Sequence, residues 1–358
     1  MKTLAFFNNK GGVGKTSLVY HLSWMFAEMG VNVVAIDLDP QSNLTSSFLE
    51  DEQLLELWDT ERSVPTIRGL IQPLLDRLGD IGTPDPVEID RRIGLVPGDL
   101  GLSLFEDRLA ETWGRCFDDN TANASDAFRV TTAFYRVMER AARQRNADLV
   151  LIDVGPNLGA INRAALVSAD HVVIPLAADL FSLQGLRNLG PTLRSWRAGW
   201  EDRKAHQARR LPNLGLAIPS GAMHPVGYVV MQPSVRENYP VAAYRRWIQR
   251  IPRVYSKEVL EQPESAEIPE PDPMALATLK NYRSLAPMAQ EARKPMFALK
   301  AADGAIGGHA AAVHASYRAF WDLAERIADA CELPLSARRL SRRRESLVSS
   351  PSHLVDGP

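Results

Sequence analysis

The chain has 358 residues, 45% of them hydrophobic, and a formal net charge of −2. This length and composition suit one large α/β domain, or two small ones, with a sizeable core. Its two cysteines, Cys116 and Cys331, lie too far apart in sequence to suggest a zinc or redox motif. No apolar run approaches the roughly 18 residues that span a bilayer, and the apolar start is too short for a signal peptide. We therefore expect a cytoplasmic protein without a transmembrane segment.

Charge is unevenly distributed along the chain. Residues 48–128 contain 18 acidic and 7 basic residues, a net charge of −11, whereas residues 187–260 contain 13 basic and 4 acidic residues, a net charge of +9. A nearly neutral protein with such a basic segment can still present a basic face to a partner.

The first predicted elements are a buried strand at residues 4–7 and a helix whose apolar residues begin at Leu18, with a glycine-rich loop between them. Strand, glycine loop and helix in this order are typical of a phosphate-binding loop. The residues predicted to bind nucleotide are Lys10, Gly11, Gly12, Val13, Gly14, Lys15, Thr16 and Ser17.

The chemistry of this loop follows from its residue types. Glycines allow backbone N–H groups to point inward without Cβ clashes, and a helix N-terminus adds partial positive charge for an anion. Lys15 is predicted to sit as a point charge between the β- and γ-phosphates, and the Thr16 hydroxyl to ligate Mg²⁺.

Two further strands are predicted to end in carboxylates. The run at 31–36 leads into Asp37 and Asp39, and the run at 149–152 leads into Asp153. In open α/β sheets, ligands bind at the carboxyl ends of parallel strands. We expect Asp153 to hold Mg²⁺, directly or through water.

The remaining elements are less informative about chemistry. We expect short helices and loops over 50–90, a strand at 92–96, a helix at about 100–112, a loop over 114–125, and one helix capped by Asp126 that runs to about 145. Further strands are expected at 171–175, 226–231 and 275–279, and a final helix carries an apolar stripe over 313–331. Residues 1–332 are assigned to the folded domain, with about 48–128 a partly inserted acidic region. Residues 333–358 are expected to form a basic, disordered tail.

Three motifs in order resemble those of one family. Residues 10–16 resemble the deviant Walker A loop of the ParA/MinD family of positioning ATPases, in which Lys10 would be the signature lysine. Residues 33–45 resemble the second motif of that family, and 148–159 resemble its Walker B strand and switch loop. The sequence departs from the family at 155–158, which read Gly-Pro-Asn-Leu where Pro-Pro-Ser-Leu is usual. The resemblance covers most of residues 1–332.

This resemblance implies a single domain with a doubly wound, mainly parallel sheet and helices on both faces. It implies ATP and Mg²⁺ as cofactors and an ATP-dependent homodimer, with Lys10 reaching the phosphates bound by the partner. Asp39 would orient the attacking water, and Lys15 would bind the phosphates. The residues implied to hold Mg²⁺ are Thr16, Asp37 and Asp153.

The function implied is that of a ParA-like ATPase. Such a protein binds DNA without sequence preference and releases it on slow ATP hydrolysis, which a ParB-like or other partner protein activates. It associates with the nucleoid and moves a plasmid, chromosome or other cargo. Three alternatives stay open: a metabolic synthetase or electron-donating ATPase, a MinD-like surface-positioning ATPase, and an accessory ATPase of a defence or secretion system. The MinD-like alternative is disfavoured because the tail lacks an amphipathic membrane helix.

The basic segment allows two interpretations. Arginines interleaved with Trp196, Trp200, Tyr244 and Trp247 could hold nucleic-acid phosphates. Equally, they could form a solvated helix face whose tryptophans belong to the core.

Overall fold

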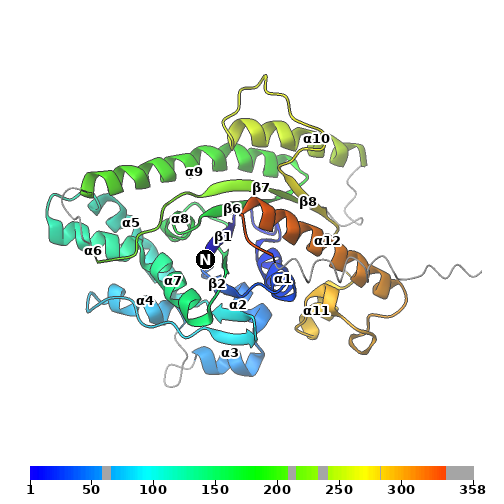
Figure 1. Ribbon diagram of the computed structural model, residues 1–358, viewed down its shortest axis with the longest axis horizontal. Helices are drawn as coiled ribbons and strands as arrows, with labels where there is room; N and C mark the ends of the chain where they lie inside the picture. Colours follow the sequence, from blue (N-terminus) through cyan, green and yellow to red (C-terminus); the bar gives the residue numbers. More distant parts are fainter. Residues whose placement is uncertain (59–65, 209–214, 233–240, 283, 336–358) are drawn as a thin grey trace, which may run out of the picture.

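An eight-stranded sheet forms the centre of the molecule (Figure 1). The computed structural model describes residues 1–58, 66–208, 215–232, 241–282 and 284–335. The strand order is β3-β4-β2-β5-β1-β6-β7-β8, and all neighbouring strands are parallel except the β3–β4 pair at one edge. The strands are β1 Lys2–Phe6, β2 Val33–Asp37, β3 Val87–Asp90, β4 Ile93–Val96, β5 Leu149–Asp153, β6 His171–Ala177, β7 His224–Met231 and β8 Ala275–Leu279.

Helices cover both faces of the sheet, because the central strands are apolar on both faces. In β1, Leu4 and Phe6 join one core cluster, and Ala5 joins the other, as the alternation of side chains along a strand requires. One layer contains α4 Ile67–Leu75, α5 Glu106–Arg115, α6 Thr121–Thr131, α7 Ala133–Arg145, α8 Ala160–Val167, α9 Leu180–Gln207 and α10 Val241–Glu258. The other contains α1 Lys15–Glu28, α2 Asn43–Phe48, α3 Asp51–Trp58, α11 Ala286–Glu291 and α12 Gly308–Ala330. The predicted doubly wound, mainly parallel fold in a single domain is confirmed.

Three short 3₁₀ helices lie in the described connections, at Leu100–Phe105, Met296–Ala298 and Ala301–Asp303. Figure 1 shows α9 and α10 running side by side, and α12 lies beside α1 on the opposite face of the sheet. Within the described ranges, no helix has the length and apolar character needed to cross a membrane.

The region between β4 and β5 differs from the prediction in two ways. The expected loop over 114–125 contains the start of α6, whose N-terminus is capped by Asn120: its Oδ1 accepts the N–H groups of Ala122 and Asn123 at 2.9 and 3.3 Å. The predicted cap, Asp126, instead lies inside α6 and pairs with Arg108 at 2.7 Å. The single predicted helix is also interrupted at Thr132, whose hydroxyl donates to the Phe128 carbonyl and so competes with regular helix geometry.

Several elements were not predicted, among them α2, α11, β3 and α8. The edge strand β3 lies where only helices and loops were expected, and its alternating half-buried and exposed residues gave a short signal between prolines. Helix α8, directly after the switch loop, has only eight residues. Most of the predicted tail, residues 336–358, lies outside the described residues, whereas Leu333 is buried in the core.

Candidate active site

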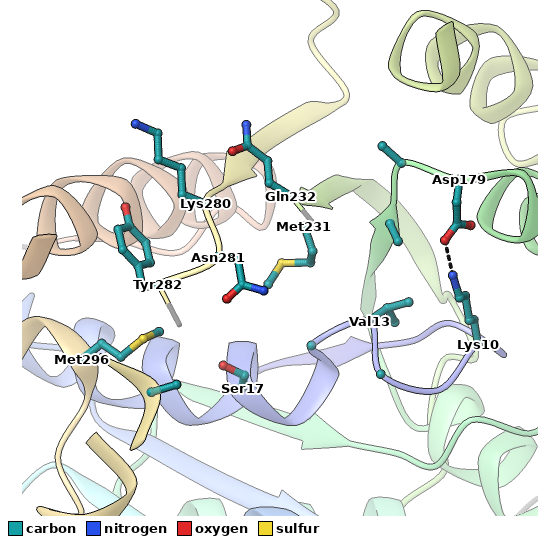
Figure 2. A pocket seen from close by; sticks show the side chains of 15 residues that line it. Lys10, Val13, Ser17, Asp179, Met231, Gln232, Lys280, Asn281, Tyr282 and Met296 are labelled. Atoms are coloured by element: carbon teal, nitrogen blue, oxygen red, sulfur yellow. Dashed lines mark hydrogen bonds and ion pairs between the residues drawn. The ribbon is translucent and has the colours of Figure 1, made fainter. Parts of the chain in front are cut away.

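The glycine loop joins β1 to α1 and forms one wall of a cavity of about 400 Å³ (Figure 2). Gly12 and Gly14 adopt φ angles of 71° and 80°, which disfavour any residue with a side chain. A Cβ on Gly14 would also lie 2.9 Å from the Met231 methyl group. The backbone conformation that leads from the loop into the first turn of α1 therefore requires glycine at these positions.

Lys15 is the first residue of α1, and it is buried. Its Nζ donates to the carbonyl oxygens of Asn8 and Lys10 at 3.2 and 3.3 Å, so it lies over the loop. Burial lowers the pKa of Lys15, and the nearby carboxylates of Asp153 and Asp39 oppose part of that change. An ammonium in this position is placed to meet phosphate oxygens inside the loop.

Lys10 lies at the rim of the cavity and forms an ion pair with Asp179 (Figure 2). Its Nζ is also 5.9 Å from the centre of the exposed Phe181 ring. Asp179 caps α9 by accepting the Ser182 N–H at 2.8 Å. Burial raises the pKa of Asp179, but the hydrogen bonds from Lys10 and Ser182 outweigh this effect and leave the pKa lowered. Lys10 is thus held within its own chain, and its action across a dimer interface stays a prediction.

The three predicted carboxylates meet at the carboxyl ends of two adjacent strands. Asp37 on β2 pairs in register with Asp153 on β5, and both are fully buried. Burial raises the pKa of Asp37 to about 6. The pKa of Asp153 is raised well above its usual value, first by burial and then by the charge of Asp37. Two adjacent buried carboxylates disfavour each other's ionisation, and a cation between them would reverse that effect.

The donor set fits Mg²⁺. Both carboxylate oxygens of Asp153 are buried and meet no hydrogen-bond partner among the described residues, and the Thr16 hydroxyl is close enough to offset part of the rise in the pKa of Asp153. The Asp37 carboxylate, in contrast, already accepts hydrogen bonds, because its Oδ2 accepts from the Thr45 N–H and hydroxyl at 2.9 and 2.8 Å. No group of three or more His, Cys, Asp or Glu residues in the described part of the chain could hold a metal alone. Phosphate oxygens and water would therefore complete the shell, as is usual for Mg²⁺.

Asp39 lies between the end of β2 and the switch loop that follows β5. It is 6% exposed, and its Oδ1 accepts the Gln41 N–H at 3.0 Å. The position of a Cβ on Gly155 would be 3.3 Å from the same oxygen. Asp39 therefore lies against the switch loop, and its charge also acts on Lys15.

The far wall of the cavity was missed by sequence reasoning. It consists of Met231 and Gln232 at the end of β7, residues 280–282 after β8, and Met296. Figure 2 shows Met231 and Asn281 across the cavity from Val13 and Ser17. The available signal was topological, since β7 and β8 follow β6 in the sheet and end at the same edge as β1.

The basic segment divides into two groups. Trp196 and Trp200 belong to the core, and Arg197 donates to the carbonyls of Ala222 and Met223, both at 2.8 Å. Arg203 stacks on Trp113, so these arginines hold the chain's own backbone and rings. The exposed arginines of α9 and α10 are Arg187, Arg245, Arg246, Arg250 and Arg253, of which Arg253 donates to the carbonyls of Glu264 and Ala266. The tryptophans of α9 therefore belong to the core, whereas Arg187 and the surface of α10 keep exposed cations.

Comparisons with known proteins agree with this geometry. A family model described as an AAA domain matches residues 1–202. The chain is 30% identical over 203 residues to the chromosome-partitioning ATPase Soj of Thermus thermophilus, covering 57% of this chain and 66% of Soj. It is 28% identical over 205 residues to the chromosome partitioning protein ParA of Caulobacter vibrioides, covering 57% and 66%. The matched part spans less than two thirds of the length of each relative.

Solved structures share the fold over nearly the whole chain. A Corynebacterium diphtheriae protein, DIP2308, superimposes with a TM-score of 0.68 at 23% identity, covering 92% of this chain and 98% of its own. A variant of Cyanothece McdA in complex with ATP gives a TM-score of 0.56 at 18% identity, covering 93% and 97%. The family model covers more than half of the chain, and the glycine loop, the strand order and the carboxylates at the strand ends agree with it. The protein therefore belongs to the ParA/MinD family of P-loop ATPases.

Proposed function

We propose that this protein is a ParA-like ATPase that binds MgATP, forms a nucleotide-sandwich dimer and hydrolyses ATP slowly to partition DNA or position another cargo. The observation that carries the proposal is the arrangement at one edge of the sheet. Lys15 lies over the loop and Lys10 at its rim, while Asp37 and Asp153 end adjacent strands and Asp39 follows Asp37 by two residues. The names of Soj and ParA among its relatives support partition as the process.

The proposed roles follow from position. Lys15 and the loop N–H groups bind the β- and γ-phosphates, and Thr16 and Asp153 hold Mg²⁺, with Asp37 beside them to steady its shell. Bound Mg²⁺ would offset the negative charge that develops on the phosphates. Asp39 orients water for attack, and Lys10 of one subunit stabilises charge on the nucleotide of the other. Phosphoryl transfer needs little beyond such positioned charges.

The rest of the cavity is proposed to hold the nucleoside. Met231 and Met296 offer apolar contact to a base, and the side chain of Asn281 offers a donor and an acceptor for its edge. Figure 2 shows Met231 and Asn281 across the cavity from Ser17, so a base bound there would leave the glycine loop for the phosphates.

We further propose that the protein binds DNA without sequence preference and moves its cargo over that DNA. The protein would be cytoplasmic and nucleoid-associated, and a ParB-like partner would stimulate its ATP hydrolysis. Arg245, Arg246 and Arg250 on α10, together with Arg187 on α9, supply exposed positive charge. Dimerisation would double the positive charge available to a duplex, so DNA binding would depend on whether ATP or ADP is bound.

Asp39→Ala and Lys15→Ala test the assignment. Asp39→Ala is expected to bind a fluorescent ATP analogue with wild-type affinity and to release no phosphate, because the cradle remains and the water is no longer oriented. Lys15→Ala is expected to lose most of the affinity itself. Equal loss of binding in both variants, or phosphate release by Asp39→Ala at the wild-type rate, would contradict the roles.

A further inference from the structure

The switch loop between β5 and α8 ends against a carboxylate from the acidic region. The loop begins after Asp153 and ends at Gly159, the N-cap of α8, which has no side chain with which to cap the helix. The carboxylate of Glu106, the first residue of α5, accepts the N–H groups of both Ala160 and Ile161, the latter at 2.9 Å. It therefore satisfies two of the four donors that a helix N-terminus leaves free, and its charge suits the positive end of the helix dipole.

The contact is close enough to restrict the sequence of the loop. A Cβ on Gly159 would lie 2.6 Å from Glu106 Oε1, so only glycine allows the carboxylate to approach the helix in this way. Glu106 is half-buried, and α5 behind it is anchored by Leu109 and Thr112 in the core. The capping side chain is thus carried by a helix that is packed into the core.

Further contacts make the loop one unit from end to end. Asn162, which is buried on α8, donates to the carbonyl oxygens of Gly155 and Asn157 at 2.8 and 2.7 Å. Asn157 Oδ1 accepts the Gly159 N–H at 2.9 Å, so the residue that departs from the family pattern closes the turn. Because Gly155 packs against Asp39, a shift of α8 at Glu106 would be carried through Asn162 to the carboxylate proposed to orient water.

A second contact ties α8 to α5. The Arg163 guanidinium lies 4.4 Å from the centre of the Trp113 ring, and its Nη2 donates to the Leu109 carbonyl at 3.4 Å. Two sites of attachment, one at the helix start and one in its first turn, fix both the position and the rotation of α8 relative to α5.

We infer that Glu106 is a positioning residue for ATP hydrolysis: it sets the switch loop against Asp39, and it gives the acidic region a role in the catalytic cycle. The inference rests on the proposed ATPase function. Removal of the Glu106 carboxylate leaves the phosphate cradle intact, and it allows α8 and the loop to move away from the water site.

The test compares Glu106→Ala with two controls. Asn120→Ala removes a cap from neighbouring α6 that likewise accepts two N–H groups, and so reproduces the loss of helix stability. Asp107→Ala removes an exposed acidic residue from the same first turn of α5. Glu106→Gln keeps the shape and one acceptor oxygen.

Glu106→Ala is expected to lower kcat by about tenfold while the affinity for a fluorescent ATP analogue changes less than about twofold. Glu106→Gln is expected to recover part of the rate, and both controls to keep it. In nucleotide-free protein, hydrogen exchange at the N–H groups of Ala160 and Ile161 is expected to accelerate about tenfold in Glu106→Ala alone. This second measurement needs no hydrolysis.

The outcomes separate the inference from the proposed function. A wild-type protein that binds and hydrolyses no ATP overturns the proposed function, and the inference with it. Wild-type hydrolysis that persists unchanged in Glu106→Ala overturns the inference alone, as does an equal loss of rate in Asn120→Ala. Unchanged exchange at Ala160 and Ile161 would show that the cap does not hold the helix, and this also overturns the inference.

Discussion

Lys10, at the rim of the phosphate loop, forms an ion pair with Asp179, the residue that caps α9. Their side chains are 31% and 17% exposed, so the pair is partly shielded from water. The lysine implied to act across a dimer interface is therefore engaged within its own chain, and the proposed assembly would have to release it.

The first prediction concerns this pair. Asp179→Asn keeps an oxygen for the Ser182 N–H and removes the charge that holds Lys10. Because a partly exposed ion pair contributes on the order of 1 kcal/mol, we expect the variant to dimerise at an ATP concentration up to about fivefold lower. Lys10→Ala is expected to stay monomeric with ATP. Light scattering with and without a slowly hydrolysed analogue measures both, and weaker assembly of Asp179→Asn would mean that the pair acts across the interface.

The second prediction concerns pH and His21. This buried ring donates through Nδ1 to the Ser17 carbonyl, accepts the Met296 N–H through Nε2, and stacks on Phe320 with ring centres 4.9 Å apart. The arrangement needs the neutral ring, and burial lowers the pKa of His21 to about 4. A lowered pKa means that the unfolded chain binds the proton more tightly, so His21 stabilises the fold fully above about pH 6.5 and loses that contribution towards pH 4.

The expected loss is about 3 kcal/mol between pH 7 and pH 4, from a pKa difference of roughly 2.5 units. Urea unfolding at several pH values measures it, with His21→Gln expected to remove this part of the slope. The exposed His314→Gln serves as control. A slope that is the same in His21→Gln and in the wild type would rule out His21 as its source.

The third prediction concerns the loop glycines. Gly14→Ala places a side chain at φ 80° and 2.9 Å from Met231, so we expect it to destabilise the fold by about 1–2 kcal/mol and to weaken nucleotide binding. Gly11→Ala meets open space at an ordinary φ, and its unfolding free energy should stay within about 0.5 kcal/mol of the wild type. Denaturant unfolding of the two variants side by side checks this, and equal stability would mean that the loop relaxes around Gly14.

The fourth prediction concerns DNA. Arg245→Glu/Arg246→Glu reverses two exposed charges on α10, and we expect it to abolish ATP-dependent binding of a random-sequence duplex. In the wild type, log affinity should fall against log salt with a slope of about −0.9 per phosphate contact. Fluorescence anisotropy at several salt concentrations, with ATP and with ADP, measures both quantities.

Two controls accompany the DNA measurement. Arg91→Glu/Arg318→Glu makes the same change in net charge at exposed positions on the β3–β4 turn and α12, and should bind DNA nearly as well as the wild type. Truncation after Pro334 removes the basic tail and should change affinity little. Loss of binding in the truncation alone would move the contact to the tail, and an ATP-bound dimer without affinity at low salt would leave a protein or membrane surface as the track.

Local sequence was sufficient to predict the elements and the glycine loop that adjacent residues form. The order of strand, glycine loop and helix predicted Lys15 and Thr16 at a phosphate site, because φ, capping and charge there are properties of neighbouring positions. Strands ending in Asp37 and Asp153 were predicted from apolar runs that only a doubly covered parallel sheet accommodates. The same reasoning failed between 114 and 132, where Asn120 and Thr132 decided the helix limits through side-chain hydrogen bonds that composition does not reveal.

Tertiary structure decided every relationship between residues distant in the chain. Only the strand order placed Asp37 beside Asp153, brought Met231 and Asn281 across from the glycine loop, and paired Lys10 with Asp179. Glu106 had no signal in sequence, since its carboxylate caps a helix that begins 54 positions later. Such contacts depend on how strands are ordered and helices are packed, and a single sequence carries that information only as the sum of many weak preferences.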